Sequence, residues 1–220
     1  MKYFVSLLIT ILFFTSCKKE DISIAEKHSD DYTIEWIEIN LDSVERLNNN
    51  DYQLLELLIP KDKNKDTLKN QIRFYSDGQL DNRYSQYYDL IVESTDKKHI
   101  YLAKIKLHSE YSNLPVRERY ADFFFLNFYQ DSTSVETKNF DNIDEFEIEF
   151  INFHNDRFEG VVTEHFIRDT IINNLNDKVN MRTIETVITN KKNMAGLFIE
   201  NGSFFNERKI SLKGYKRLTQ

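Results

Sequence analysis

Three glutamates are the first residues whose type and spacing could support chemistry. Glu145, Glu147 and Glu149 occupy every second position. On a strand such side chains share one face about 7 Å apart, since each residue advances the chain by roughly 3.3 Å. The row could supply half of a glycosidase carboxylate pair or a patch for a divalent cation. The intervening residues are only phenylalanine and isoleucine, so the alternation favours a solvated strand face whose other side is apolar.

The histidines are the next candidate bases and metal ligands. They are His28, His99, His108, His154 and His165. None lies three or four residues from another, which is the spacing that metal ligands on a helix require. His154 and His165 are expected on neighbouring strands, but the turn expected between them places them out of register.

Nucleophile and phosphate-binding motifs are absent from the sequence. The chain has five glycines and contains no phosphate-cradling glycine loop, no Rossmann fingerprint and no Gly-x-Ser-x-Gly elbow. We therefore predict no catalytic residue, no metal and no cofactor.

Cys17 is the only cysteine of the chain, and it follows a segment typical of exported proteins. Lys2 supplies a positive charge, and the apolar run that ends at Phe14 is too short for the roughly 20 residues of a membrane-spanning helix. The small residues Thr15 and Ser16 suit a signal peptidase, and the thiol follows them directly. The pattern predicts a signal peptide over residues 1–16 and acylation of Cys17, which leaves the mature body without disulfide or thiol chemistry.

The segment Phe14-Thr15-Ser16-Cys17 resembles the lipobox of bacterial lipoproteins, which has Leu where Phe14 stands and Ala or Gly where Ser16 stands. Lys18-Lys19-Glu20-Asp21 resembles the charged export signal of surface-displayed lipoproteins of Bacteroidetes. These resemblances imply an outer-membrane lipoprotein that is held in the cell envelope by acyl chains such as palmitate. Its body faces either outward or inward, and both orientations stay open.

The later part of the chain resembles small outer-membrane lipoproteins of Bacteroidetes. The resemblance rests on Phe146–Ile151, the Asn155-Asp156 turn, Phe158–Val162 and Ile199–Phe204. It implies a β-rich body on a lipid anchor, without a common catalytic set. Gly160 stands inside a strand of this region and indicates a bulge or a close backbone approach.

Alternation of apolar and polar residues is the dominant pattern from Tyr32 onward and is typical of strands. Residues 17–31 are read as the lipidated cysteine and a polar tether, and residues 32–220 as a single β-rich domain. We expect a mainly β fold, either an antiparallel β-sandwich or a strongly curled sheet of about nine or ten strands, with one or two short helices.

Individual segments carry more specific expectations. We expect a hairpin of Tyr88–Ser94 with Ile100–His108, a central strand at Phe123–Tyr129, a return of Glu145–Phe153 through Phe158–Ile167, strands Leu197–Glu200 and Ser203–Phe205 around Asn201-Gly202, a turn at Asp77-Gly78 and a short helix from Asp42 to Leu47. Gln53–Ile59 is ambiguous between helix and strand.

The net charge and the aromatic content limit the classes of partner that the protein can have. The net charge of −7 argues against nucleic acid and against broad contact with anionic lipid headgroups, so the membrane is met through the lipid anchor. Tyr75, Tyr84 and Tyr87 form a candidate binding surface for a glycan or an envelope protein, since tyrosine combines an apolar ring with a polar tip.

Three functions follow as hypotheses. The first is a non-enzymatic binding module for an envelope protein or glycan. The alternatives are an envelope hydrolase, directed at carbohydrate, and an immunity or inhibitor lipoprotein whose acidic body neutralises a basic partner. The hydrolase requires a cleft with two carboxyls, one of them with a raised pKa.

Overall fold

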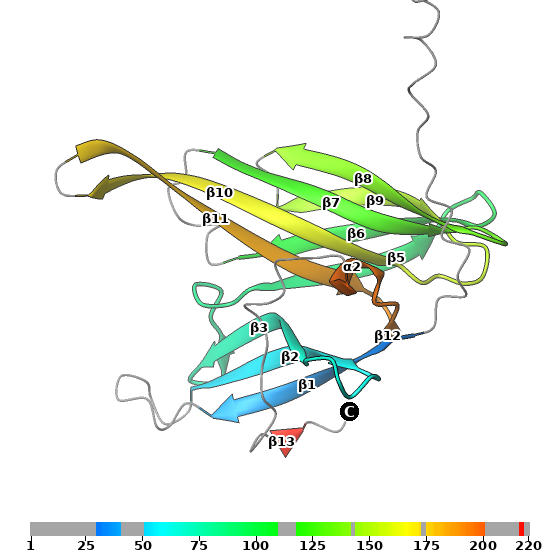
Figure 1. Ribbon diagram of the computed structural model, residues 1–220, viewed down its shortest axis with the longest axis horizontal. Coiled ribbons are helices and arrows are strands. Elements are labelled where there is room, and N and C mark those ends of the chain that lie inside the picture. Colours follow the sequence, from blue (N-terminus) through cyan, green and yellow to red (C-terminus); the bar gives the residue numbers. More distant parts are fainter. Residues whose placement is uncertain are drawn as a thin grey trace, which may run out of the picture.

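The described part of the chain is built almost entirely of antiparallel strands (Figure 1). The computed structural model describes residues 30–40, 51–109, 118–141, 144–172, 175–200 and 216–217. Within these ranges, ten strands have seven or more residues and three have two. The predicted mainly β, antiparallel architecture is confirmed.

The first sheet contains the N-terminal strands and has six members in the order β12-β1-β2-β3-β4, with β13 beside β1. Its strands are β1 (Tyr32–Asn40), β2 (Tyr52–Pro60), β3 (Leu68–Ser76), β4 (Gln79–Leu80), β12 (Asn193–Met194) and β13 (Lys216–Arg217). The ambiguous segment Gln53–Ile59 is therefore strand. The predicted turn at Asp77-Gly78 is confirmed, with φ of 48° and 76° at the two residues.

Two further sheets contain the remaining strands. The four-stranded sheet has the order β11-β10-β7-β8 and the three-stranded sheet the order β5-β6-β9. Their strands are β5 (Tyr87–Ser94), β6 (Ile100–His108), β7 (Glu118–Phe128), β8 (Thr133–Asp141), β9 (Glu145–Ile151), β10 (Glu159–Ile172) and β11 (Leu175–Thr189). The predicted β5–β6 hairpin is confirmed, and β7 lies between β10 and β8 as a central strand should.

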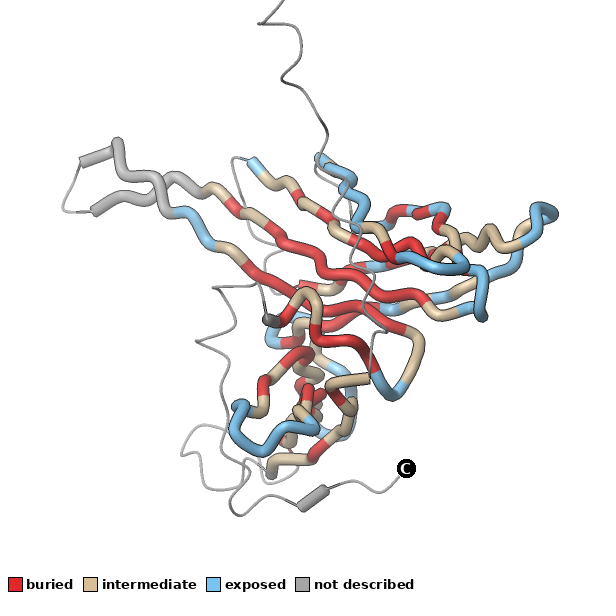
Figure 2. The backbone as a smooth tube through the Cα atoms, turned by 45° about the vertical axis from the view of Figure 1, so that its right-hand side comes forward, coloured by how far each residue is buried: buried red, intermediate tan, exposed pale blue. Residues whose placement is uncertain are grey.

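The main core fills the space between the four-stranded and three-stranded sheets. Its buried residues are Tyr88, Ala103, Ile105, Leu107, Ala121, Phe123, Phe125, Phe146, Ile148, Phe150, Phe158, Val162 and Ile188. Figure 2 shows this burial along the central strands, with exposed residues at many of the turns. The alternation in β9 is confirmed, because its glutamates are exposed and its apolar residues are buried. The two sheets thus form a sandwich.

A second apolar layer joins the first sheet to the outer face of β10 and β11. Val161 and Val187 point away from the main core and pack with Leu58 and Leu68 of the first sheet. Strands buried on both faces are apolar on both faces, and the valine pair Val161-Val162 shows this within β10. The first sheet is therefore held against the sandwich by its own hydrophobic cluster.

The expectation that β10 returns beside β9 as its neighbouring strand is wrong. β9 pairs with β6, and β10 pairs with β7 and β11, so His154 and His165 do not lie on neighbouring strands. Both β9 and β10 direct an apolar face into the same core, which they do from opposite sheets. The side chain of Asn152 shapes the crossing: its Oδ1 accepts from the backbone N of His154 at 2.9 Å, and its Nδ2 donates to the carbonyl of Arg157 at 2.9 Å.

The expected strand at Leu197–Glu200 is also wrong, because these residues form the short helix α2. The backbone N of Ile199 donates to the carbonyl of Gly196 at 3.0 Å. This turn brings Ile199 into the second apolar layer, with Phe198 packed against it. A short run of consecutive apolar residues has no clear period, so burial decided the conformation.

Several expectations lie outside the described residues. They are the signal peptide over residues 1–16, Cys17, most of the tether, the helix from Asp42 to Leu47, the Asn201-Gly202 turn and the strand Ser203–Phe205. Within the described ranges, no helix is long and apolar enough to cross a membrane.

Gly160 makes the close backbone approach that its place in a strand indicated. A Cβ at this position would lie 2.7 Å from the carbonyl oxygen of Phe124 and 2.8 Å from Cε1 of Phe123. We expect Gly160→Ala to lower the free energy of unfolding by about 1–3 kcal/mol, because the carbonyl belongs to a paired strand and cannot retreat. Urea unfolding measures the change. Alanine lowers the conformational entropy of the unfolded chain and would by itself stabilise the fold, so an unchanged or raised stability of Gly160→Ala would refute the steric explanation.

Candidate functional site

An irregular pairing between β2 and β3 creates the polar centre of the molecule. The register shifts between Leu55 and Leu57, so two β3 residues, Asn70 and Gln71, oppose Glu56. Such bulges re-aim side chains and are common beside functional sites. Glu56 is only 3% exposed, and Asn70 and Gln71 are also buried. Three polar side chains are therefore concentrated inside the protein.

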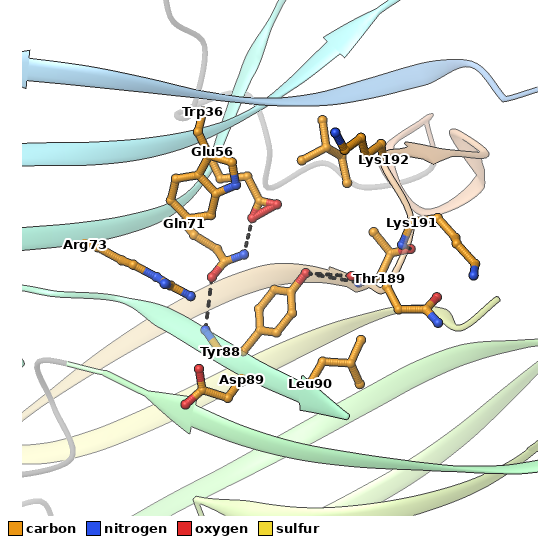
Figure 3. Close-up of a pocket in the computed structure, with 12 residues that line it drawn as sticks. Trp36, Glu56, Gln71, Arg73, Tyr88, Asp89, Leu90, Thr189, Lys191 and Lys192 are labelled. Carbon is orange, nitrogen blue, oxygen red and sulfur yellow. Dashed lines mark hydrogen bonds between the residues drawn. The ribbon is translucent and has the colours of Figure 1, made fainter. Parts of the chain in front are cut away.

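A chain of hydrogen bonds runs from this bulge through β5 to the end of β11 (Figure 3). Nε2 of Gln71 donates to the carboxylate of Glu56, and Oε1 of Gln71 accepts from the backbone N of Tyr88 at 3.1 Å. The hydroxyl of Tyr88 donates to the carbonyl of Thr189 at 3.2 Å and accepts from its backbone N at 3.1 Å. The network connects all three sheets and satisfies its buried polar groups.

The side chain of Asn70 links the first sheet to β11 through two hydrogen bonds to one backbone residue, as a neighbouring strand would. Its Nδ2 donates to the carbonyl of Val187 and its Oδ1 accepts from the backbone N of Val187, both at 2.8 Å. A pair of backbone hydrogen bonds of 2.8 Å between Ile72 and Gln86 adds a second connection, from β3 to the residue before β5. These contacts hold the junction of the three sheets in place.

A cavity of about 460 Å³ opens at this junction. It is lined by Ile34, Trp36, Glu56, Gln71, Arg73, Tyr88, Asp89, Leu90, Thr189, Asn190, Lys191 and Lys192. The volume lies within the range of small-molecule sites, which are concave and often formed where structural units meet. The lining combines aromatic rings, two aliphatic side chains and five charged groups.

Burial controls the ionisation of Glu56. Desolvation raises the pKa of its carboxyl to about 7, and the hydrogen bonds from Gln71 and Asn70 and the charge of Arg73 only partly oppose this. Burial also raises the pKa of Tyr88 well above its usual value. Near neutral pH, Glu56 therefore carries a proton in a substantial fraction of molecules.

Arg73 is held by aromatic rings rather than by an acid. Its guanidinium carbon lies 5.3 Å from the ring centroid of Trp36 and 4.8 Å from that of Tyr87, which is cation–π geometry. Nε of Arg73 is buried and has no hydrogen-bond partner. Within the described ranges, Arg73 makes no hydrogen bond or ion pair at all.

Of the other charged groups of the cavity, Lys191 and Asp89 have charged partners, and Lys192 is exposed. Nζ of Lys191 lies 2.5 Å from Oδ1 of Asp156. The carboxylate of Asp89 lies 2.8 Å from Nε2 of His108. Arg73 is thus the inward cation whose charge is not matched by a direct contact among the residues that the structure places.

The three tyrosines of the predicted binding surface do not lie in equivalent environments. Tyr84 is 59% exposed, with the guanidinium of Arg83 over its ring. Tyr75 is half-buried and stacks on Tyr52, with ring centroids 4.6 Å apart. Tyr87 is only 7% exposed, so its ring supports Arg73 and is not presented to a partner. Only part of the predicted surface is therefore accessible.

The acidic row of β9 is an exposed face, and two of its three glutamates pair with lysines. Glu145 contacts Lys106, and Glu149 lies 3.9 Å from Lys97. The described histidines are scattered among ring stacks with Phe153, Tyr87 and Tyr120 and contacts with backbone or carboxylate. Among the residues placed by the structure, no group of three or more histidine, cysteine, aspartate or glutamate side chains is arranged to hold a metal ion.

A second buried carboxyl lies at the start of β10. Glu159 is fully buried, and its Oε2 accepts from Nη2 of Arg157 at 2.7 Å. Arg157 also contacts Asp30 at 2.7 Å. Desolvation raises the pKa of Glu159 to about 7 in spite of Arg157. Glu159 is not among the residues that line the cavity, and through Arg157 it couples β10 to the residues just before β1.

Comparisons with known proteins add little. No protein-family model matches the chain, and no curated protein sequence matches it. One solved structure with some likeness is the chicken interferon gamma receptor alpha chain, at 11% identity over 71% of this chain and 84% of that one, with a TM-score of 0.24. At that score the likeness has no bearing on function.

Proposed function

We propose that the protein is a lipid-anchored, non-enzymatic binding module of the bacterial cell envelope, with Cys17 as its acylated residue. The cavity at the junction of the three sheets is the binding site. The observation that carries the proposal is the arrangement of its polar groups: Glu56, Gln71, Tyr88 and Thr189 are held by a continuous chain of hydrogen bonds. A preformed cavity of this kind suits recognition.

The carboxyls of the cavity are poorly placed for catalysis. A general acid must reach the substrate atom it protonates within hydrogen-bond distance. Glu56 is 3% exposed and accepts a hydrogen bond from Gln71, and Asp89 is engaged by His108. These contacts favour a supporting role for both carboxyls over an acid–base pair.

A carbohydrate-directed hydrolase is the second candidate, and one observation favours it. Glu56 and Asp89 both line the cavity, and the pKa of Glu56 is raised to about 7. Glycoside hydrolysis uses two carboxyls, one of which acts as an acid with a raised pKa. In that case Glu56→Gln would abolish turnover of a glycan, whereas a binding module retains its ligand with this variant.

Cell fractionation tests the lipid anchor. We expect the wild-type chain to incorporate a palmitate analogue and to sediment with membranes. Cys17→Ser should lose the label and enter the soluble fraction, because the thiol of Cys17 is the group that receives the diacylglyceryl anchor. Ser16→Ala, which keeps the thiol, is the matched control. Labelling of Cys17→Ser at the wild-type level would overturn the anchor.

Capture of partners by the acylated protein tests binding itself. A specific protein or glycan, recovered by the wild type and lost when the cavity is altered, supports the module. Protease treatment of intact cells reports the orientation: degradation of the body indicates display on the surface, and full protection indicates an inward-facing domain. Release of product from a captured glycan would favour the hydrolase.

A further inference from the structure

We infer that the cavity at the sheet junction binds a small organic monocarboxylate, whose carboxylate pairs with Arg73 and whose compact apolar body lies against Trp36, Ile34 and Leu90. This inference rests on the proposed binding function and names its ligand class. Three properties of the cavity support it: an unmatched guanidinium, the balance of the charges around it and the chemistry of its walls.

The environment of the Arg73 guanidinium suits the binding of an anion. Buried or half-buried arginines are normally paired with carboxylate or another acceptor, but this one has only the rings of Trp36 and Tyr87 beside it, at 5.3 and 4.8 Å. The rings fix the plane of the guanidinium, and no described residue accepts a hydrogen bond from its N–H groups. A planar fork held in this way matches a carboxylate through two parallel hydrogen bonds.

The surrounding charges favour a single negative charge. Lys191 is engaged by Asp156 and Asp89 by His108, while Lys192 adds an exposed amine at the cavity edge. Glu56 is partly neutral near pH 7 because burial raises its pKa to about 7. Asp89 and the ionised fraction of Glu56 oppose a dianion such as inorganic phosphate, since like charges repel strongly in a partly buried site.

The walls favour an apolar body over a sugar rich in hydroxyls. Gln71 and Tyr88 already make hydrogen bonds with one another, with Glu56 and with Thr189. Asn190 accepts from the backbone N of Phe158 and donates to the carbonyl of Asp156. Few neutral polar groups of the lining therefore remain for a ligand, and its apolar surfaces belong to Trp36, Ile34 and Leu90.

The only tryptophan of the chain lies in this cavity, so its fluorescence reports occupancy directly. We would titrate the full chain, purified in detergent, with cyclohexanecarboxylate, which does not absorb where tryptophan does. The neutral cyclohexanecarboxamide, glucuronate and inorganic phosphate serve as comparison probes. We expect a saturable fluorescence change with the carboxylate at about millimolar concentration or below, and at least about tenfold weaker binding of the other three.

Variants of Arg73 and Lys192 test which positive side chains bind the carboxylate of the ligand. Arg73→Gln should weaken binding of cyclohexanecarboxylate by about tenfold or more, because a charge-assisted hydrogen-bond pair is lost. Arg83→Gln is the matched control, since Arg83 also lies over a tyrosine ring, at 5.6 Å, but is exposed and paired with Asp81. Lys192→Glu changes an exposed residue at the cavity edge and should weaken binding several-fold, whereas Lys63→Glu, also exposed, should not.

Each outcome decides between the claims. Equal binding of the carboxylate and its amide, tighter binding of phosphate, or wild-type affinity in Lys192→Glu and Arg73→Gln would overturn the carboxylate site. Tighter binding of glucuronate, which is also a carboxylate, would overturn the apolar body of the ligand. If Arg73→Gln fails to fold, the Lys192→Glu result stands in its place. Failure of the small-ligand titration while partner capture by the wild type is lost in these variants overturns this inference alone, whereas a wild type that binds neither the carboxylate nor a partner overturns the proposed function.

Discussion

Between pH 4.5 and about pH 7.5, the free energy of unfolding should fall by at least about 3 kcal/mol. The fall comes from two carboxyls, Glu56 and Glu159, whose pKa values burial raises from 4.5 to about 7. For each group, a difference of one between the pKa values of the folded and unfolded chain corresponds to about 1.4 kcal/mol. Burial raises the pKa of Glu164 as well, so a third group acts in the same direction.

The sign follows from where the protons are bound. Between the unfolded pKa of 4.5 and the folded value of about 7, the folded protein retains protons that the unfolded chain has lost. Rising pH then favours the unfolded chain, and the loss is complete above the folded pKa. Asp81 and Asp156, whose pKa values are lowered by Arg83 and Lys191, stabilise the fold above 3.8, and this contribution is lost only at lower pH.

Urea unfolding at a series of pH values measures this dependence. Glu56→Gln should flatten the slope and raise stability near pH 7.5 relative to the wild type, because an amide bears no charge to desolvate. Glu147→Gln, on the exposed face of β9, should leave the slope unchanged. A wild-type stability that rises steadily from pH 4.5 to pH 7 would contradict the account, since paired carboxylates would then dominate.

The strands that bury one face could be predicted from the sequence, and their partners could not. Alternation located β5, β6 and β9, because each of them places apolar side chains on the core side at every second position. Which strands become neighbours depends on the hydrophobic core into which each apolar face is buried, and the alternation does not show this. β9 and β10 are consecutive in the chain, yet they lie in opposite sheets because both cover the same core.

The cavity could not be predicted because it is assembled from segments that only the fold brings together. Glu56 and Trp36 lie on β2 and β1, and Tyr88 lies on β5. Two signals could have indicated part of it. Glu56 is a lone charge in an apolar run, and the adjacent polar pair Asn70-Gln71 interrupts the alternation of β3. Such an interruption is what a bulge produces. Of the tyrosines predicted to form a binding surface, Tyr87 does lie beside the cavity, but as a buried support for Arg73.

Phe123→Ala should lower the free energy of unfolding by about 3–5 kcal/mol, the largest effect that we expect of a core substitution in this protein. Phe123 is fully buried. Its ring centroid lies 5.4 Å from that of Phe146 in an edge-on contact and 6.0 Å from that of Phe158. These partners come from β9 and from the crossing before β10, so the lost ring opens a cavity between the two sheets.

Urea unfolding of Phe123→Ala and Phe123→Leu tests this, with Leu expected to cost less because it refills part of the space. Phe153→Ala is the control, since Phe153 is 41% exposed, and it should cost about 1 kcal/mol or less.

A double-mutant cycle separates the two contacts that a Cβ on Gly160 would make. A Cβ on Gly160 would lie 2.8 Å from the Phe123 ring, so Phe123→Leu should relieve part of the damage done by Gly160→Ala. Strict additivity of the two substitutions would mean that the backbone carbonyl of Phe124, 2.7 Å from the same Cβ, accounts for the whole clash.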